Sequence, residues 1–401
     1  MVQQSNMDTA LIDDRFSTSS FDSWIAQARA GTLTDEGIAR LAQTLAASGA
    51  RLASRERSAD LASTGGPGSI STIWGPAALV ATGSRVAKLG VPGRPAGGID
   101  VLMQIDGYRS DLDERAAEQV LDQCGYVHLL AGKTFAPMDA AMFAYRQQVG
   151  AQHLPALAIA SLLSKKLATG TSNTGLEVRA SSYGNFGADH RAAVENAERY
   201  CRVADLLGLR GVCFITDGTI IQQPYLGRGE ALLALSLLLE GREDDWLGQH
   251  VSNCERWCEI LADNGRPSRQ AVAEALLDNI SVQGGDVNCL HERAAYVVSG
   301  HRLTVTSTET GTVEFNPGAL RQAIIAARRP DTPGSFDDSA GLVLLARPGS
   351  KVSRGQPLVS ARCEDAVSTQ LLGDIEAAIS ITQKETVGDP KGHGAVEVVG
   401  V

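Results

Sequence analysis

The stretch LPALAIASLLSKKLAT, residues Leu154–Thr169, is rich in Ala and Leu and has the boundaries of a buried helix. Pro155 stands where a first helical turn tolerates proline, and Gly170 follows the last helical residue. Ser161 and Lys165 are four residues apart and therefore share one face of this helix. Because an unpaired buried charge is costly, a hydroxyl and an ammonium group on an otherwise apolar face need polar partners.

Arg146 precedes this helix by less than ten residues and offers a third polar group. A planar guanidinium, a hydroxyl and an ammonium suit a uracil-like ring, whose two carbonyl oxygens accept hydrogen bonds and whose N3–H donates one. The alternative is that Lys165 and Lys166 form a solvated helix end favoured by the helix dipole, with Arg146 an ordinary surface residue. The spacing alone leaves both interpretations open.

The pattern of Arg146, a Leu-Pro pair and S-x-x-x-K-K-L-x-x-G beginning at Ser161 resembles the base-binding stretch of the thymidine and pyrimidine nucleoside phosphorylase family. In that family the Arg, the Ser and the first Lys hold the pyrimidine. The resemblance therefore implies that Arg146, Ser161 and Lys165 bind the base, and that Lys165 and Arg146 act catalytically by stabilising the leaving base. The acidic residue that follows the Arg in the family is replaced by Gln147.

A glycine-rich turn, Ser63–Ser69, opens a helical run that continues to Gly83. Glycine lets backbone amides approach an anion, and a helix N-terminus favours negative charge, although many helices follow turns of this kind without binding anything. In the family the same place reads K-H-S-T-G-G-x-G-D and cradles phosphate, and either Ser71 or Thr72 matches a further hydroxyl. The phosphate-binding residues implied by the resemblance are Ser63, Thr64, Gly65, Gly66, Thr72 and Lys88.

Part of the family's phosphate site is missing. A dianionic phosphate usually requires Lys or Arg, and Arg94 or Arg179 could supply the lost positive charge. A loop, Ser181–Gly187, followed by His190 is a further candidate for closing over the sugar. The residues at family phosphate-site positions that break the pattern are Leu61, Ala62, Gly90 and Ile99.

Strand and helix signals alternate between residues 101 and 240, which predicts an α/β core. We predict an α/β fold with a small all-helical lobe, an α/β domain with a mixed sheet, and a small β-rich C-terminal module. From about His291 the pattern turns to β, and we expect residues 1–20 to be disordered and the last twenty or so to be frayed. The predicted segments are 1–57 and 139–172 for the helical lobe, 58–138 and 173–290 for the α/β domain, and 291–401 for the C-terminal module.

The composition excludes several classes of protein. The net charge is −10, which disfavours nonspecific nucleic-acid binding. The N-terminus lacks an apolar signal core and no run is long enough for a membrane span, so we expect a cytoplasmic protein that contacts no membrane. Seven scattered Cys and seven His without ligand spacing predict no disulfide framework and no metal site.

The resemblance implies phosphate as a co-substrate, no other cofactor, and a pyrimidine nucleoside or base as the partner. The family's structural monovalent cation is bound mostly by backbone, so the sequence leaves it open. A homodimer is typical of the family, but the helical segment that forms its contact is shortened here.

Three functions are compatible with these residues. The first is a pyrimidine nucleoside phosphorylase, or a close glycosyl-transferring relative with a remodelled anion site. The second keeps the pyrimidine site but uses water or another small acceptor in place of phosphate. The third is a non-catalytic nucleoside- or base-binding protein.

Overall fold

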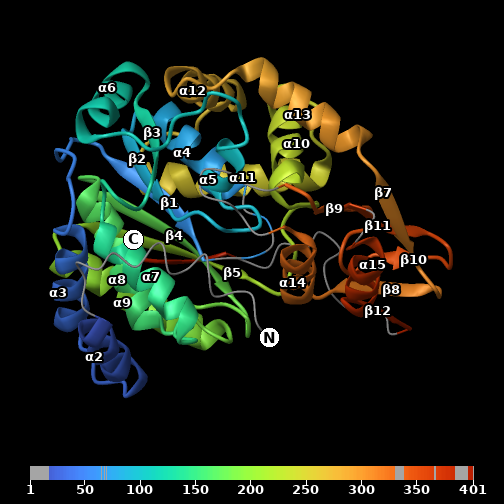
Figure 1. Ribbon diagram of the computed structural model, residues 1–401, viewed down its shortest axis with the longest axis horizontal. Coiled ribbons are helices and arrows are strands. Elements are labelled where there is room, and N and C mark those ends of the chain that lie inside the picture. The colour runs from blue at the N-terminus through green and yellow to red at the C-terminus, as the bar shows by residue number, and fades with distance from the viewer. Residues whose placement is uncertain are drawn as a thin grey trace.

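The computed structural model describes residues 18–64, 66, 68, 70–329, 338–364, 367–383 and 396–400. It has the predicted α/β architecture, with a helical lobe on one side of a mixed central sheet and a β-rich C-terminal module at the far end (Figure 1). Among these residues, no helix is both long enough and apolar enough to span a membrane.

The central sheet has the strand order β1-β4-β5-β13. Its first three strands run parallel, and the last strand is antiparallel to β5. A parallel pair, β2-β3, continues the sheet through an isolated bridge between Ser58 and Arg85. The strands are β1 Ala59–Ser63, β2 Val86–Gly90, β3 Tyr126–Leu130, β4 Asn173–Ala180, β5 Arg210–Asp217 and β13 Glu397–Val399.

Helices cover both faces of this sheet and bury it in two separate apolar cores. One face carries α4 Ser71–Ala81, α10 Arg228–Leu239, α11 Asp245–Ala262 and α12 Arg269–Val282, with α5 Gly98–Leu102, α6 Glu114–Cys124 and α13 Val287–Ser299 around them. The other face carries α9 His190–Leu206 and the helical lobe, which consists of α2 Thr18–Arg29, α3 Asp35–Ala46, α7 Pro137–Gln148 and α8 Pro155–Ala168.

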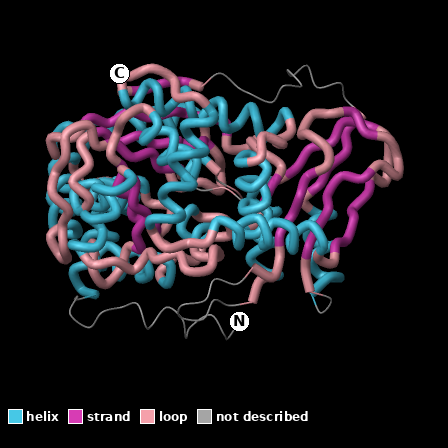
Figure 2. Tube along the Cα trace, turned by 90° about the horizontal axis from the view of Figure 1, so that it is seen from above, coloured by secondary structure: helices cyan, strands magenta, loops and turns pink. Residues whose placement is uncertain are grey.

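The C-terminal module consists of two antiparallel sheets with the orders β6-β9-β11-β7 and β10-β8-β12. Figure 2 shows these strands gathered at one end of the molecule. The elements are β6 Tyr225–Leu226, β7 Arg302–Thr306, β8 Gly311–Phe315, α14 Pro317–Ala327, β9 Gly341–Leu344, β10 Lys351–Val352, β11 Pro357–Arg362, α15 Ser368–Ala377 and β12 Ile379–Thr382.

The predicted elements between residues 101 and 240 are confirmed, but both chain ends differ from expectation. Residues 1–17 lie outside the described part, whereas Thr18 to Ser20 belong to α2 because Phe21 and Ile25 of that helix are buried against the lobe. Near the C-terminus β13 pairs with β5, so the prediction of a frayed end is wrong for residues 397–399.

Helix α13 corrects a second prediction, the start of the β-rich region at about His291. The helix runs across this position, because Asp286 caps its start and its apolar side packs into the core through Leu290 and Val297. The first long strand of the C-terminal module begins only at Arg302. The division of the chain into five segments remains a prediction.

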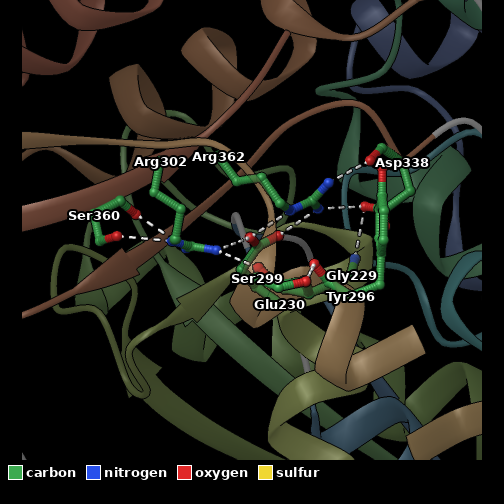
Figure 3. Close-up of polar contacts among 9 residues, drawn as sticks. Gly229, Glu230, Tyr296, Ser299, Arg302, Asp338, Ser360 and Arg362 are labelled. Carbon is green, nitrogen blue, oxygen red and sulfur yellow. Dashed lines mark hydrogen bonds and ion pairs between the residues drawn. The ribbon is translucent and has the colours of Figure 1, made fainter. Parts of the chain in front are cut away.

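A buried ionic network joins α10 to the C-terminal module (Figure 3). The Glu230 carboxylate is fully buried and accepts hydrogen bonds from Arg362 Nε and Nη2, both at 2.9 Å, and from Arg302 Nη1 at 3.3 Å. Asp338 adds a second carboxylate, 2.7 Å from Arg362 Nη2. Gly341 makes room for the Glu230 carboxylate, because a Cβ at position 341 would lie 1.5 Å from Glu230 Oε2.

Glu230→Ala should destabilise the protein by about 3–5 kcal/mol, because it leaves two guanidinium groups buried without their shared carboxylate. Urea unfolding followed by circular dichroism measures the change. The control is Glu364→Ala, which breaks the exposed pair with Arg329 and should cost at most about 1 kcal/mol. Equal losses in the two variants would contradict the importance of the buried network.

Candidate active site

A cavity of about 690 Å³ lies where the parallel strands β1, β2 and β4 end. Its walls come from α7 and α8 of the helical lobe, from the loops that follow these strands, and from the first turn of α14. In open α/β sheets, ligands bind outside the carboxyl ends of the strands, and the volume is within the usual range of small-molecule sites.

The three predicted base-binding residues line the same part of this cavity. The ammonium of Lys165 lies 2.9 Å from Ser161 Oγ and 2.9 Å from the Ser161 carbonyl, one turn earlier on α8. Arg146 ends α7, where its Nε and Nη2 donate to the carbonyls of Ala151 and Gln152 at 3.1 and 3.0 Å. These bonds hold the guanidinium plane and leave Nη1 without an acceptor among the described residues.

Burial governs the electrostatics of this group. Lys165 and Arg146 are 6% and 3% exposed, so the alternative of a solvated helix end does not hold. Burial lowers the pKa of Arg146 to about 10 and also lowers the pKa of Lys165, while the nearby Asp139 carboxylate opposes both shifts. Arg146 therefore stays cationic near neutral pH.

Asp139 is the partner that sequence reasoning missed. It is fully buried in the first turn of α7 and pairs with Lys165 Nζ. The signal was present in the sequence, because Asp139 and Arg146 are seven residues apart and thus fall on one helix face. Only the packing of α7 against α8 shows that the carboxylate reaches Lys165.

The predicted phosphate residue Lys88 also lines the cavity, but its charge is already matched. Lys88 Nζ lies 2.8 Å from Asp60 Oδ1 and 2.6 Å from the Leu61 carbonyl, and Lys166 pairs with the other oxygen of Asp60. Burial would raise the pKa of Asp60, but Lys166 and Lys88 outweigh it and lower that pKa to about 2. Sequence reasoning did not identify Asp60 as a partner of these lysines either.

The glycine-rich loop after β1 meets Arg179, which ends β4. Arg179 Nη1 donates to the Gly68 carbonyl at 3.2 Å, and its backbone N–H donates to Thr64 Oγ1 at 2.9 Å. Gly66 has φ +107°, and a Cβ there would lie 2.2 Å from Arg179 Nη1, so only glycine fits. Glu177 accepts from Arg179 Nε at 2.8 Å and orients the guanidinium.

The remaining predicted phosphate residues are placed as follows. Thr72 faces the cavity, whereas Ser71 donates to Glu177 at 2.9 Å and does not line it. Gly65 lies outside the described residues. Ser63, Thr64, Gly66, Thr72 and Lys88 all line the same cavity as Arg146, Ser161 and Lys165.

Gly90, at the end of β2, and Ile99, in α5, are coupled in space. A Cβ at Gly90 would lie 2.8 Å from the Cβ of Ile99, so the Ile99 side chain takes the place of a side chain at position 90. Gly90 and Ile99 themselves therefore offer no polar side chain to this wall of the cavity.

Two histidines, His190 and His128, lie in different surroundings. His190 lies outside the cavity lining, and its Nε2 contacts Glu397 of β13 at 2.8 Å. Residues 181–185 of the loop before it do line the cavity, and closure of this loop over the sugar stays a prediction. His128 lines the cavity beside Lys88, with Nδ1 2.9 Å from the hydroxyl of Tyr126. Burial, with the charge of Lys88, lowers the pKa of His128 to about 3, so the ring is neutral near neutral pH.

The cavity carries strongly one-sided charge for a protein with a net charge of −10. Six cationic side chains line it, and no Asp or Glu does so among the described residues. Such a surface favours an anionic ligand or an anionic transition state. The six are Lys88, Arg94, Arg146, Lys165, Arg179 and Arg321.

Comparison with solved structures gives anthranilate phosphoribosyltransferases from Thermus thermophilus and Saccharomyces cerevisiae, each with a TM-score of 0.47. Sequence identity is 16% and 15%, over 71% and 74% of this chain and 96% and 88% of theirs. No protein-family model matches the sequence.

Comparison with curated proteins gives relatives with higher sequence identity. The chain is 29% identical to thymidine phosphorylase of Mycobacterium tuberculosis over 339 residues, which cover 80% of this chain and 77% of that protein. It is 25% identical to pyrimidine-nucleoside phosphorylase of Bacillus subtilis over 324 residues, 75% of this chain and 73% of that protein. These matches support a diverged relationship of this chain to the thymidine and pyrimidine-nucleoside phosphorylases.

Proposed function

We propose that this pentosyltransferase-like enzyme cleaves or forms the N-glycosidic bond of a pyrimidine nucleoside, with phosphate as the acceptor. The observation that carries the proposal is that Arg146, Ser161 and Lys165 open into the same cavity as the loop of Gly66 and Gly68. A nucleoside bound with its base on α8 would thus present its sugar toward an anion on that loop.

The proposed reaction is a displacement at the anomeric carbon. The bond between this carbon and the base nitrogen breaks, and its electron pair leaves with the base. A phosphate oxygen forms the new bond and yields a pentose 1-phosphate. Lys165 and Arg146 stabilise the negative charge that develops on the base, and preorganised donors of this kind contribute about 3–4 kcal/mol each.

Acceptor binding is assigned to Thr72, Arg179 and the amides of the glycine-rich loop. Arg179 provides a guanidinium beside this loop in place of the Lys and His found in the resembled family. No side chain acts as a nucleophile in this scheme, so positioning of the two substrates supplies much of the rate.

A second candidate is favoured by the apolar contact between Gly90 and Ile99 and by the neutralised charge of Lys88. With fewer donors for phosphate, the acceptor would be water or another small molecule, on the same pyrimidine site. Base release from uridine or thymidine, measured with and without phosphate, separates the two. Release of the base without phosphate would support the second function and exclude phosphorolysis. Binding of the nucleoside without turnover would indicate a non-catalytic binding protein.

Lys165→Met should lower kcat/KM for uridine phosphorolysis roughly 100-fold, because the leaving base loses a preorganised cation. Absorbance of the released base measures the rate, and circular dichroism checks that Asp139, now unpaired, does not unfold the protein. Lys133→Met, at an exposed lysine outside the cavity, is the matched control. Unchanged kinetics in Lys165→Met would remove this residue from the base site.

Arg179→Lys should raise KM for phosphate about tenfold, because lysine keeps the charge near Glu177 but loses the planar fork. KM for the nucleoside should change much less, since Arg146, Ser161 and Lys165 are untouched. Initial rates with phosphate and uridine varied separately give both constants. A rise in the nucleoside KM alone would place Arg179 at the sugar and not at phosphate.

A further inference from the structure

Three of the six cavity cations have no role in the proposed reaction, and two of these three, Arg94 and Arg321, also lack a paired carboxylate in the described part of the chain. Arg94 follows β2, and Arg321 lies in the first turns of α14, in the C-terminal module. Both line the cavity, yet neither guanidinium forms an ion pair or donates a hydrogen bond to a carboxylate among the described residues. The other cations of the cavity wall are matched by Asp60, Asp139 and Glu177 or bound by carbonyl groups.

The position of Arg94 is fixed although its charge is not matched. Its guanidinium stacks on the ring of Phe143 at 4.7 Å. Its carbonyl accepts from Arg228 Nε at 3.0 Å and from Arg328 Nη1 at 3.2 Å, and its amide donates to Asp100 at 3.1 Å. Burial, with the positive charge of Arg321, lowers the pKa of Arg94 to about 10, and the nearby Asp100 carboxylate opposes this shift. A guanidinium that lines the cavity beside a second cation, without a carboxylate of the described residues bonded to it, favours the binding of an anion there.

Helix α14 contributes further residues to the cavity wall. Its first residues, from the N-cap Asn316 to Ala319, line the cavity together with Arg321. The positive end of the helix dipole therefore lies at the cavity that Arg321 also lines. Burial lowers the pKa of Arg321, and repulsion from Arg328 lowers it further.

We infer that Arg94, Arg321 and the N-terminus of α14 form a second anion subsite, which binds a phosphate monoester on the sugar of the substrate. The substrate class is then a pyrimidine nucleoside 5′-monophosphate. This inference rests on the proposed function, which already assigns the base to Arg146, Ser161 and Lys165 and the acceptor phosphate to the loop beside Arg179. The nucleotide and the acceptor phosphate together occupy three polar sites in one cavity. The C-terminal module contributes Arg321 and α14 to the third of these sites.

The test compares uridine with uridine 5′-monophosphate, and thymidine with thymidine 5′-monophosphate, in the presence of phosphate. The wild-type enzyme should prefer the monophosphate about 10- to 100-fold in kcat/KM, the contribution of one or two hydrogen bonds between charged groups. Arg321→Gln should reduce the ratio of the two kcat/KM values about tenfold. Arg354→Gln, at an exposed arginine outside the cavity, is the matched control and should leave the ratio unchanged.

Two results would overturn the inference while the proposed function stands. One is uridine turnover equal to or faster than that of the monophosphate. The other is an increase in KM for inorganic phosphate in Arg321→Gln that is equal for both substrates, which would assign Arg321 to the acceptor.

A binding measurement separates failure of the subsite from failure of the proposed function. Isothermal titration of ribose 5-phosphate and of ribose should show binding of the phosphorylated sugar only, weakened about tenfold in Arg321→Gln. If no nucleoside or nucleotide is turned over but this difference persists, the subsite stands and the proposed reaction falls. Equal binding by the two proteins removes the subsite.

Discussion

Lys166 of α8 and Lys88 of β2 reach the same carboxylate, that of Asp60 on β1, which is fully buried. This contact joins the helical lobe to the central sheet and sets the rotation of α8. Because neighbouring residues on a helix point about 100° apart, fixing Lys166 on the sheet side turns Lys165 toward Asp139 and the cavity. The geometry of the proposed base site therefore depends on a carboxylate that does not line the cavity.

The cavity and its surroundings follow one electrostatic rule. Lys88, Lys165 and Arg179 of the cavity wall, and Arg228 behind it, are each matched by a carboxylate, and these carboxylates lie outside the cavity lining. Asp100 illustrates the rule, since it pairs with Arg228 at 2.8 Å and holds the amides of Gly93 and Arg94 while lying outside the lining. An anion in the cavity thus meets donors without meeting an acidic side chain.

Helix α10 connects this arrangement to the C-terminal module. Its first turn carries Arg228, which orders the loop of Arg94, and Glu230, which binds Arg302 and Arg362 of the module. The same turn thereby positions two walls of the cavity. The β-rich module, which places Arg321 at the cavity, is thus connected to the α/β core by matched charges and not by apolar packing alone.

Sequence reasoning was most successful where chemistry is local. The period of the apolar residues and the proline and glycine at its ends predicted helix α8, and the four-residue spacing predicted that Ser161 and Lys165 share a face. The α/β class, the strand β3 and the helix α6 followed from local patterns of the same kind. The resemblance added the glycine-rich loop, whose described residues Ser63, Thr64, Gly66 and Gly68 line the cavity.

What the tertiary structure decided was the pairing of charges over long sequence distances. Asp60 and Lys166 are more than one hundred residues apart, and Arg321 is further still from the loop of Arg94. Spacing along the chain carries no information about such contacts, because each depends on how helices and sheets pack. The sequence by itself determined which polar groups each helix and loop presents; only packing decided which of them are neutralised and which remain to bind an anion.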